Sequence, residues 1–391
     1  MMDRGTETKS ATAVRSRPGA ISLSGIKNSV AGNIGARAQF LAIAFAGVAC
    51  TLSLVARRLL PERFLLDDHH IKLAIESPLA GEEKSQSFRN IAAFYRVLGL
   101  GYDPALDALL TMAVFTLTVL VAARWTEIAR FGVVGVGVMA ICFLCAVVYL
   151  TQYTKESIPV LMVLLLLTMP RHVGAEILFV GAAIGYGALF RQYWFCVAAF
   201  YVVWRVLLAK TRNPLWILIA VAVLYSLLEI IFKNILGENL TSFRNLVNDS
   251  REGSAVASLI VDPLAGNGFS MVPSAMLLLL GLLVPVQLFL SGTAFHLVSG
   301  AMIAFLWITA LTGILRSKRG SRAGSEPDLH PRTKMDSNRS LRATRAAALL
   351  LAVVLVQAIF EPDFGSYLKH LTPLLPLFLV LVPLREGGVT P

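Results

Sequence analysis

"AQFLAIAFAGVACTLSLVA", residues 38–56, is an apolar run of the length that crosses a membrane. Spanning the hydrocarbon of a bilayer takes about 20 consecutive, mostly apolar residues. The run ends at Arg57 and Arg58 without the A-x-A pattern of a cleaved secretory signal. It therefore predicts a retained membrane anchor.

Similar runs recur along the chain, at 105–123, 131–150, 157–170, 173–190, 193–208, 215–232, 272–290, 294–315, 346–360 and 371–384. The 391 residues are 56% hydrophobic and only 15% charged, with a mean hydropathy of +0.69. These values exclude an ordinary soluble domain. The runs lack the apolar/polar alternation of barrel strands, so helices must satisfy the backbone in lipid. We predict an all-α, polytopic integral membrane protein with about 10 or 11 transmembrane helices.

The net charge of +11 lies mainly in two basic segments, residues 1–37 and 316–345. Loops rich in Lys and Arg remain in the cytoplasm, so the charge indicates orientation and not nucleic-acid binding. We predict a cytoplasmic tail (1–37), a helical membrane domain (38–315), a cytoplasmic linker (316–345) and a C-terminal helix pair (346–391). Both termini are then cytoplasmic, in a bacterial inner membrane. The loops 57–104, 233–271 and 361–370 face the periplasm.

Counting crossings from the two ends of the chain gives different results between residues 271 and 316. An odd number of crossings is needed there, but the two apolar runs provide an even number. We therefore predict a re-entrant or interfacial segment at 254–269, because irregular backbone is tolerated where it lines a cavity in the protein. The four cysteines all fall inside apolar runs and are expected to serve in packing.

Candidate catalytic residues, four acids and one histidine, cluster in the predicted periplasmic segments. Asp67 and Asp68 follow the first span, and Glu361, Asp363 and His370 precede the last. Adjacent carboxylates raise each other's pKa and can act as a general base or hold a divalent metal. The alternative for Asp67 and Asp68 is a solvated loop or helix cap.

Basic groups occupy the same predicted face: Lys155, Arg191, Arg244, Arg251 and Lys369. Arg191 lies in a very short turn among aromatic residues, and a guanidinium held there suits bidentate binding of phosphate. Anchoring at the interface is the alternative for Lys155 and Arg191, and a solvated loop is the alternative for Arg244 and Arg251.

Three short stretches carry a resemblance: "YTKES" (153–157), "FRQYW" (190–194) and "FEPDFGSYLKH" (360–370). In these, and in its many spans, the chain resembles bacterial polysaccharide polymerases of the Wzy and EpsG kind. The resemblance implies elongation of a glycan carried on a polyprenyl diphosphate, with Lys155, Arg191 and Lys369 gripping the diphosphate. It also implies a bilayer setting and other polysaccharide assembly proteins as partners. It implies no cofactor, and a divalent metal is the alternative that the acidic pair leaves open.

The loop 233–271 is shorter than the large periplasmic loop of many such polymerases. Asp67 and Asp68 instead resemble the acidic motif of lipid-dependent GT-C glycosyltransferases, which is the alternative function. In both kinds of enzyme, a sugar hydroxyl attacks an anomeric carbon, a base takes up the hydroxyl proton, and cations stabilise the leaving phosphate. A transporter or flippase is a third alternative, but its interrupted helices in two related halves are not visible in the sequence.

Overall fold

The computed structural model describes residues 23–77, 86–211, 213–242, 244, 260, 264, 271–316 and 334–384. This part of the chain is helical and contains no strand. Six of its helical segments are long and apolar enough to cross a membrane: Ala38–Leu59, Pro104–Ala123, Pro214–Ile235, Ala294–Leu315, Asn338–Phe360 and Phe364–Leu381. Shorter apolar helices cover Val133–Tyr149, Ser157–Thr168, Val173–Leu189 and Met271–Leu283. The prediction of an all-α, polytopic membrane protein is confirmed.

The helices follow the predicted runs closely. They are α1 (Leu23–Leu59), α2 (Leu66–Glu76), α3 (Gln86–Val97), α4 (Pro104–Ala123), α5 (Val133–Tyr149), α6 (Ser157–Thr168), α7 (Val173–Leu189), α8 (Trp194–Lys210), α9 (Pro214–Ile231), α11 (Met271–Leu283), α12 (Val286–Leu290), α13 (Ala294–Arg316), α15 (Lys334–Phe360), α16 (Phe364–Leu371) and α17 (Leu375–Leu381). Single turns of 3₁₀ helix lie at Glu62–Phe64, Leu100–Tyr102, Ile128–Arg130 and Thr372–Leu374, and a π-helical turn lies at Phe232–Leu236. Helix α15 begins inside the predicted linker 316–345, and α1 begins inside the predicted tail 1–37.

Polar residues define where several helices begin. The Asp103 side chain accepts hydrogen bonds from the backbone N–H groups of Ala105 and Leu106, with Pro104 at the first position of α4. Asn213 and Pro214 start α9 in the same way. Such residues satisfy the free N–H groups of a first turn, and proline lacks one of them.

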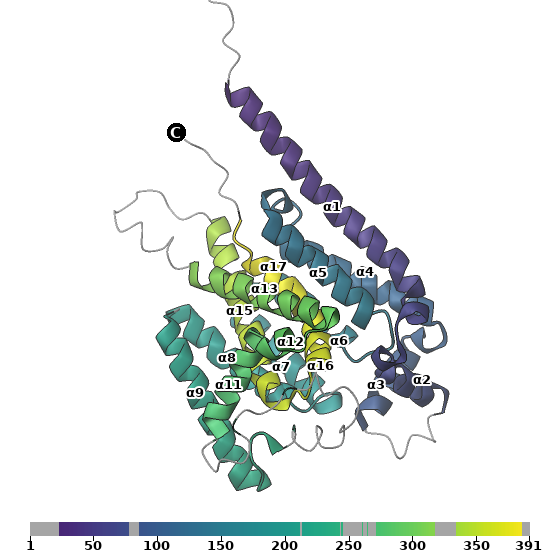
Figure 1. Cartoon of the computed structure of the whole chain (residues 1–391), viewed down its shortest axis with the longest axis vertical. Helices are drawn as coiled ribbons and strands as arrows, with labels where there is room; N and C mark the ends of the chain where they lie inside the picture. Colours follow the sequence, from purple (N-terminus) through teal and green to yellow (C-terminus); the bar gives the residue numbers. More distant parts are fainter. Residues whose placement is uncertain are drawn as a thin grey trace, which may run out of the picture.

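Helix α15 forms the centre of the bundle and α1 its edge (Figure 1). In the apolar part of α15, 89% of the residues are buried inside the protein, against 22% for α1. A helix that is apolar on all sides can be buried on all sides, and α15 packs against α8, α11 and α17. Helix α1 lies along α4 and α5 and leaves most of its apolar surface for lipid.

The bundle has two distinct ends. We call the polar end the one that holds α2, α3, the turns 151–156 and 190–193, and the junction of α15 with α16. There the Tyr153 hydroxyl donates to the Leu100 carbonyl and the Tyr95 hydroxyl donates to the Thr154 carbonyl. We call the arginine end the one where Arg345 of α15 donates to the carbonyls of Met169 and Pro170. The spans α4, α5, α6, α7 and α8 run alternately between these ends.

The chain changes ends between residues 271 and 316, as the charge pattern requires. Helix α11 begins beside Glu229, whose Oε1 lies 3.3 Å from the Met271 N–H nitrogen. Helix α13 finishes at the other end, where Gly313 packs against Leu381 of α17. The predicted span 272–290 is divided at Pro285 into α11 and the short α12. The predicted re-entrant segment 254–269 lies outside the described residues except for Ile260 and Leu264.

Candidate functional site

Segments distant in sequence bring charged side chains together at the polar end. Helix α2 contributes Asp67, and the turn before α6 contributes Lys155 and Glu156. The turn between α7 and α8 contributes Arg191, and the junction of α15 with α16 contributes Glu361, Lys369 and His370. We call these seven residues the polar cluster.

Asp67 and Lys369 form an ion pair across the cluster. Burial disfavours the charged carboxylate, but Lys369 and Arg191 together hold the pKa of Asp67 below its usual range. Asp67 therefore stays ionised at neutral pH. Its side chain is 22% exposed, so it can be reached from outside the bundle.

Arg191 and Glu156 form a second ion pair, with 2.5 Å between Nη2 and Oε1. The Glu156 side chain is only 3% exposed. Burial alone would lower the pKa of Arg191, yet the neighbouring Glu156 carboxylate raises that pKa well above its ordinary value. The Nε of Arg191 is buried without a hydrogen-bond partner among the described residues. Arg191 thus balances a buried glutamate.

His370 links Glu156 to Glu361. Its Nδ1 lies 2.7 Å from Glu361 Oε2, and its Nε2 lies 3.5 Å from Glu156 Oε1. Burial, assisted by nearby Asp363, raises the pKa of Glu361 to about 8. Protonated Glu361 donates to Nδ1, and the Nε2 hydrogen of His370 then faces Glu156. These contacts place His370 between two buried carboxyl groups in the interior of the polar end.

Lys155 differs from the other cations of the cluster. Its Nζ donates to the Ser87 hydroxyl at 2.7 Å and lies 3.5 Å from the centre of the Phe88 ring. Within the described part of the chain, no carboxylate lies within ion-pair distance of it. Burial, with the Arg191 charge nearby, lowers the pKa of Lys155 to about 8. A buried cation of this kind is well suited to an external anion.

Other predicted site residues have structural contacts. Asp68 pairs with Arg57 of α1 and accepts from the Tyr153 N–H at 2.8 Å, so it joins α1, α2 and the 151–156 turn. Asp363 caps α16 by accepting from the Ser366 N–H at 2.8 Å. Arg244 is buried and donates to the carbonyls of Glu361 and Ala358 at the end of α15. Arg251 lies outside the described residues.

The structure adds residues that the sequence did not indicate as site residues. Glu156 could have been noticed as an acid between a lysine and a span, but its arginine partner lies 35 positions away. Asp107 is 1% exposed inside the predicted span 105–123, near the polar end. A carboxyl inside an apolar run was the signal for it, because such groups are costly in membranes.

The described residues include no group of three or more His, Cys, Asp or Glu side chains placed to hold a metal ion. Asp67 and Asp68, for which the sequence allowed either a general base or a divalent metal, each contact a cation. The cluster is thus an arrangement of ion pairs with one unpaired lysine, suited to holding an anionic group beside an ionised carboxylate.

A scan against protein-family models and searches of curated proteins and of solved structures found no match to this chain.

Proposed function

We propose that the polar cluster binds the diphosphate of a polyprenyl-linked glycan, and that the protein polymerises such glycans at the periplasmic face of a bacterial inner membrane. The observation that carries the proposal is the environment of Lys155. This buried cation has no carboxylate at ion-pair distance among the described residues. It lies near two ion pairs, Arg191–Glu156 and Lys369–Asp67, at one end of a membrane bundle. A diphosphate at the membrane surface has the charge and position to complete that site.

In this proposal each member of the cluster has a separate task. Lys155 contacts the diphosphate, and Lys369 and Arg191 keep the surroundings positive while they balance Asp67 and Glu156. Asp67 is the most exposed of the three carboxylates of the polar cluster. It accepts a hydrogen bond from the attacking sugar hydroxyl and then its proton.

The bonds made and broken are those of an inverting glycosyl transfer. The acceptor oxygen forms a bond to the anomeric carbon, and the bond from that carbon to the diphosphate oxygen breaks. The electron pair leaves with the diphosphate, whose added charge Lys155 stabilises. The hydroxyl proton passes to Asp67.

The test is the set of lipid-linked glycans in a strain from which the gene is deleted. A polymerase mutant accumulates single complete repeat units, and these are cleaved by a glycosidase added to intact spheroplasts because they lie in the outer leaflet. Repeat units lacking one sugar would instead assign a single-sugar transferase of the GT-C kind. Complete units that resist the glycosidase until the spheroplasts are lysed would assign a flippase. Unchanged lipid-linked glycans would refute the proposal.

A further inference from the structure

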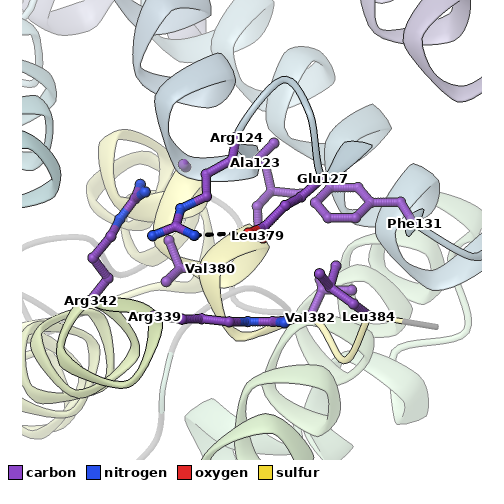
Figure 2. Close-up of a pocket in the computed structure, with 11 residues that line it drawn as sticks. Ala123, Arg124, Glu127, Phe131, Arg339, Arg342, Leu379, Val380, Val382 and Leu384 are labelled. Atoms are coloured by element: carbon purple, nitrogen blue, oxygen red, sulfur yellow. Dashed lines mark hydrogen bonds and ion pairs between the residues drawn. The ribbon is translucent and has the colours of Figure 1, made fainter. Parts of the chain in front are cut away.

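A second polar feature lies at the arginine end, far along α4 and α15 from the polar cluster. It is a small, open recess lined by Ala122, Ala123, Arg124, Glu127, Phe131, Arg339, Arg342, Leu379, Val380, Val382 and Leu384. Figure 2 shows three arginines among its lining residues, one from the end of α4 and two from the start of α15. We call it the arginine recess.

The charges of the arginine recess are only partly balanced. Arg124 Nη1 donates to Glu127 Oε1 at 2.8 Å, which is the one ion pair among the lining residues. Arg342 donates through Nη2 to the Val121 carbonyl at 2.6 Å, and so offsets the negative carbonyl end of α4. Its Nε is buried with no hydrogen-bond partner in the described part of the chain. Three arginines against one glutamate leave the recess positive.

The backbone at Arg124 is unusual. Its φ is 53°, and no other non-glycine residue among those described has a positive φ. The residue ends α4, a position where glycine is normally favoured because it has no Cβ. The conformation is uncommon for a non-glycine residue, and here it is adopted by an arginine that lines the recess.

The rest of the lining is apolar. Phe131, Val382 and Leu384 lie on the side of the recess opposite Arg342 (Figure 2). Trp125, the residue after Arg124, is 43% exposed, as is typical of the boundary between lipid and water. The Arg339 side chain extends toward Val382, so a group held here meets both guanidinium and hydrocarbon (Figure 2).

We propose that the arginine recess binds the phosphate headgroup of an anionic membrane lipid, with its acyl chain along the apolar side. Guanidinium groups bind phosphate oxygens through paired N–H donors, and basic pockets between transmembrane helices accommodate such headgroups. Free phosphate shares the charge but cannot use the apolar side, so the lipid is the better occupant. This site is separate from the polar cluster and does not depend on the proposed function.

The test uses the full-length protein in nanodiscs of phosphatidylcholine, with or without phosphatidylglycerol. Thermal unfolding and native mass spectrometry report stabilisation by phosphatidylglycerol and the number of lipids retained. Each arginine near the surface contributes enough that Arg339→Ala should weaken the apparent affinity about fivefold. Arg342→Ala should do the same.

Two variants separate binding from damage to the fold. Arg124→Gly suits the positive φ, so the lipid-free protein should be at least as stable as wild type, yet it should bind phosphatidylglycerol about fivefold more weakly. Glu127→Gln removes the competing carboxylate and should bind more tightly. Arg171→Ala is the control, because this exposed arginine belongs to the same end but not to the recess.

The proposal is overturned if Arg171→Ala weakens lipid binding as much as Arg339→Ala, or if Glu127→Gln and Arg124→Gly leave it unchanged. It is also overturned if inorganic phosphate, added to the protein in phosphatidylcholine nanodiscs, stabilises wild type as strongly as phosphatidylglycerol does. That result would assign a site for a soluble anion.

Discussion

Lys369 of α16 forms an ion pair with Asp67 of α2, although 302 positions separate them in sequence. The pair connects the predicted acidic segment after the first span with the polar segment before the last. It leaves Asp67 ionised and partly exposed beside Lys155 and Arg191. The site therefore exists only when the first and last parts of the chain are packed together.

Asp67 and Asp68 should respond differently to the same substitution. Asp67→Asn disturbs the contact with Lys369 alone, whereas Asp68 contacts both Arg57 and the Tyr153 N–H. The Asp67 variant should therefore remain in the membrane while glycan assembly falls roughly 100-fold or more through loss of the base. Asp68→Asn loses the Arg57 pair that holds α1 to α2, so the level of folded protein should fall. Immunoblots of membranes and glycan gels measure both effects. Equal loss of protein in the two variants would contradict this division of roles.

Arg191 should tolerate lysine but not alanine. Arg191→Ala leaves the Glu156 carboxylate buried and unpaired, which costs about 3–5 kcal/mol in the free energy of unfolding. Arg191→Lys keeps the charge that balances Glu156, so its membrane level and most glycan assembly should persist. From the sequence of the turn alone, we expected Arg191 to bind phosphate through paired N–H donors. Lysine cannot provide that geometry, so the sequence predicted that Arg191→Lys would lose activity.

The double variant Arg191→Ala with Glu156→Gln is the control for this pair. It removes both charges, so it should recover much of the stability lost in Arg191→Ala. Thermal unfolding in detergent measures the recovery. If the double variant is as unstable as the sum of the two single variants, the ion pair is not what holds Arg191.

Lys155 should make substrate capture depend on pH. Its pKa of about 8 means that it is charged below pH 8 and loses its charge as the pH rises through that value. We expect kcat/KM for the lipid-linked substrate to decline above about pH 8 in wild type. Lys155→Arg stays charged throughout, so this decline should be absent from its profile.

Lys155→Met is the matched neutral variant. It keeps the length of the apolar stem against Phe88 but removes the charge at every pH, so kcat/KM should be low and flat where wild type is active. A wild-type profile that stays level through pH 9 would contradict the proposed role of Lys155 in binding the diphosphate.

Glu361 should lower the stability of the protein as the pH rises. Its folded pKa of about 8 lies above the ordinary value of 4.5. The folded state therefore holds a proton that the unfolded state has lost, and stability falls from about pH 4.5 up to about pH 8. In Glu361→Gln this contribution is absent. Thermal unfolding should show wild type losing stability relative to Glu361→Gln as the pH rises through this range. Parallel curves for the two proteins would show that folded Glu361 does not hold the proton.

Gly313 should be intolerant of a methyl group. A Cβ at this position would collide with the Leu381 carbonyl oxygen, where α13 packs against α17. Because backbone atoms cannot move aside cheaply, Gly313→Ala should cost about 1–3 kcal/mol. Gly281→Ala is the control, since no heavy atom lies within 4 Å of its Cβ position. Equal unfolding temperatures for the two variants would refute the close contact.

The sequence by itself determined that this is an all-α membrane protein, because the length and apolar character needed to cross a bilayer are local properties of each run. It also indicated Asp67, Lys155, Arg191 and Lys369, because a charge beside a span is costly unless it is at an aqueous face or has a partner.

The tertiary structure alone decided which charges meet. Asp67 and Asp68 are neighbours in sequence, yet one contacts α16 and the other α1. Glu156 acquires its role only through Arg191 and His370, and the arginine recess only through the approach of α4 to α15. The central burial of α15 was equally invisible, since a lipid-facing helix and a buried one share the same apolar composition. These features depend on how helices pack, and packing is set by contacts between residues that no local pattern connects.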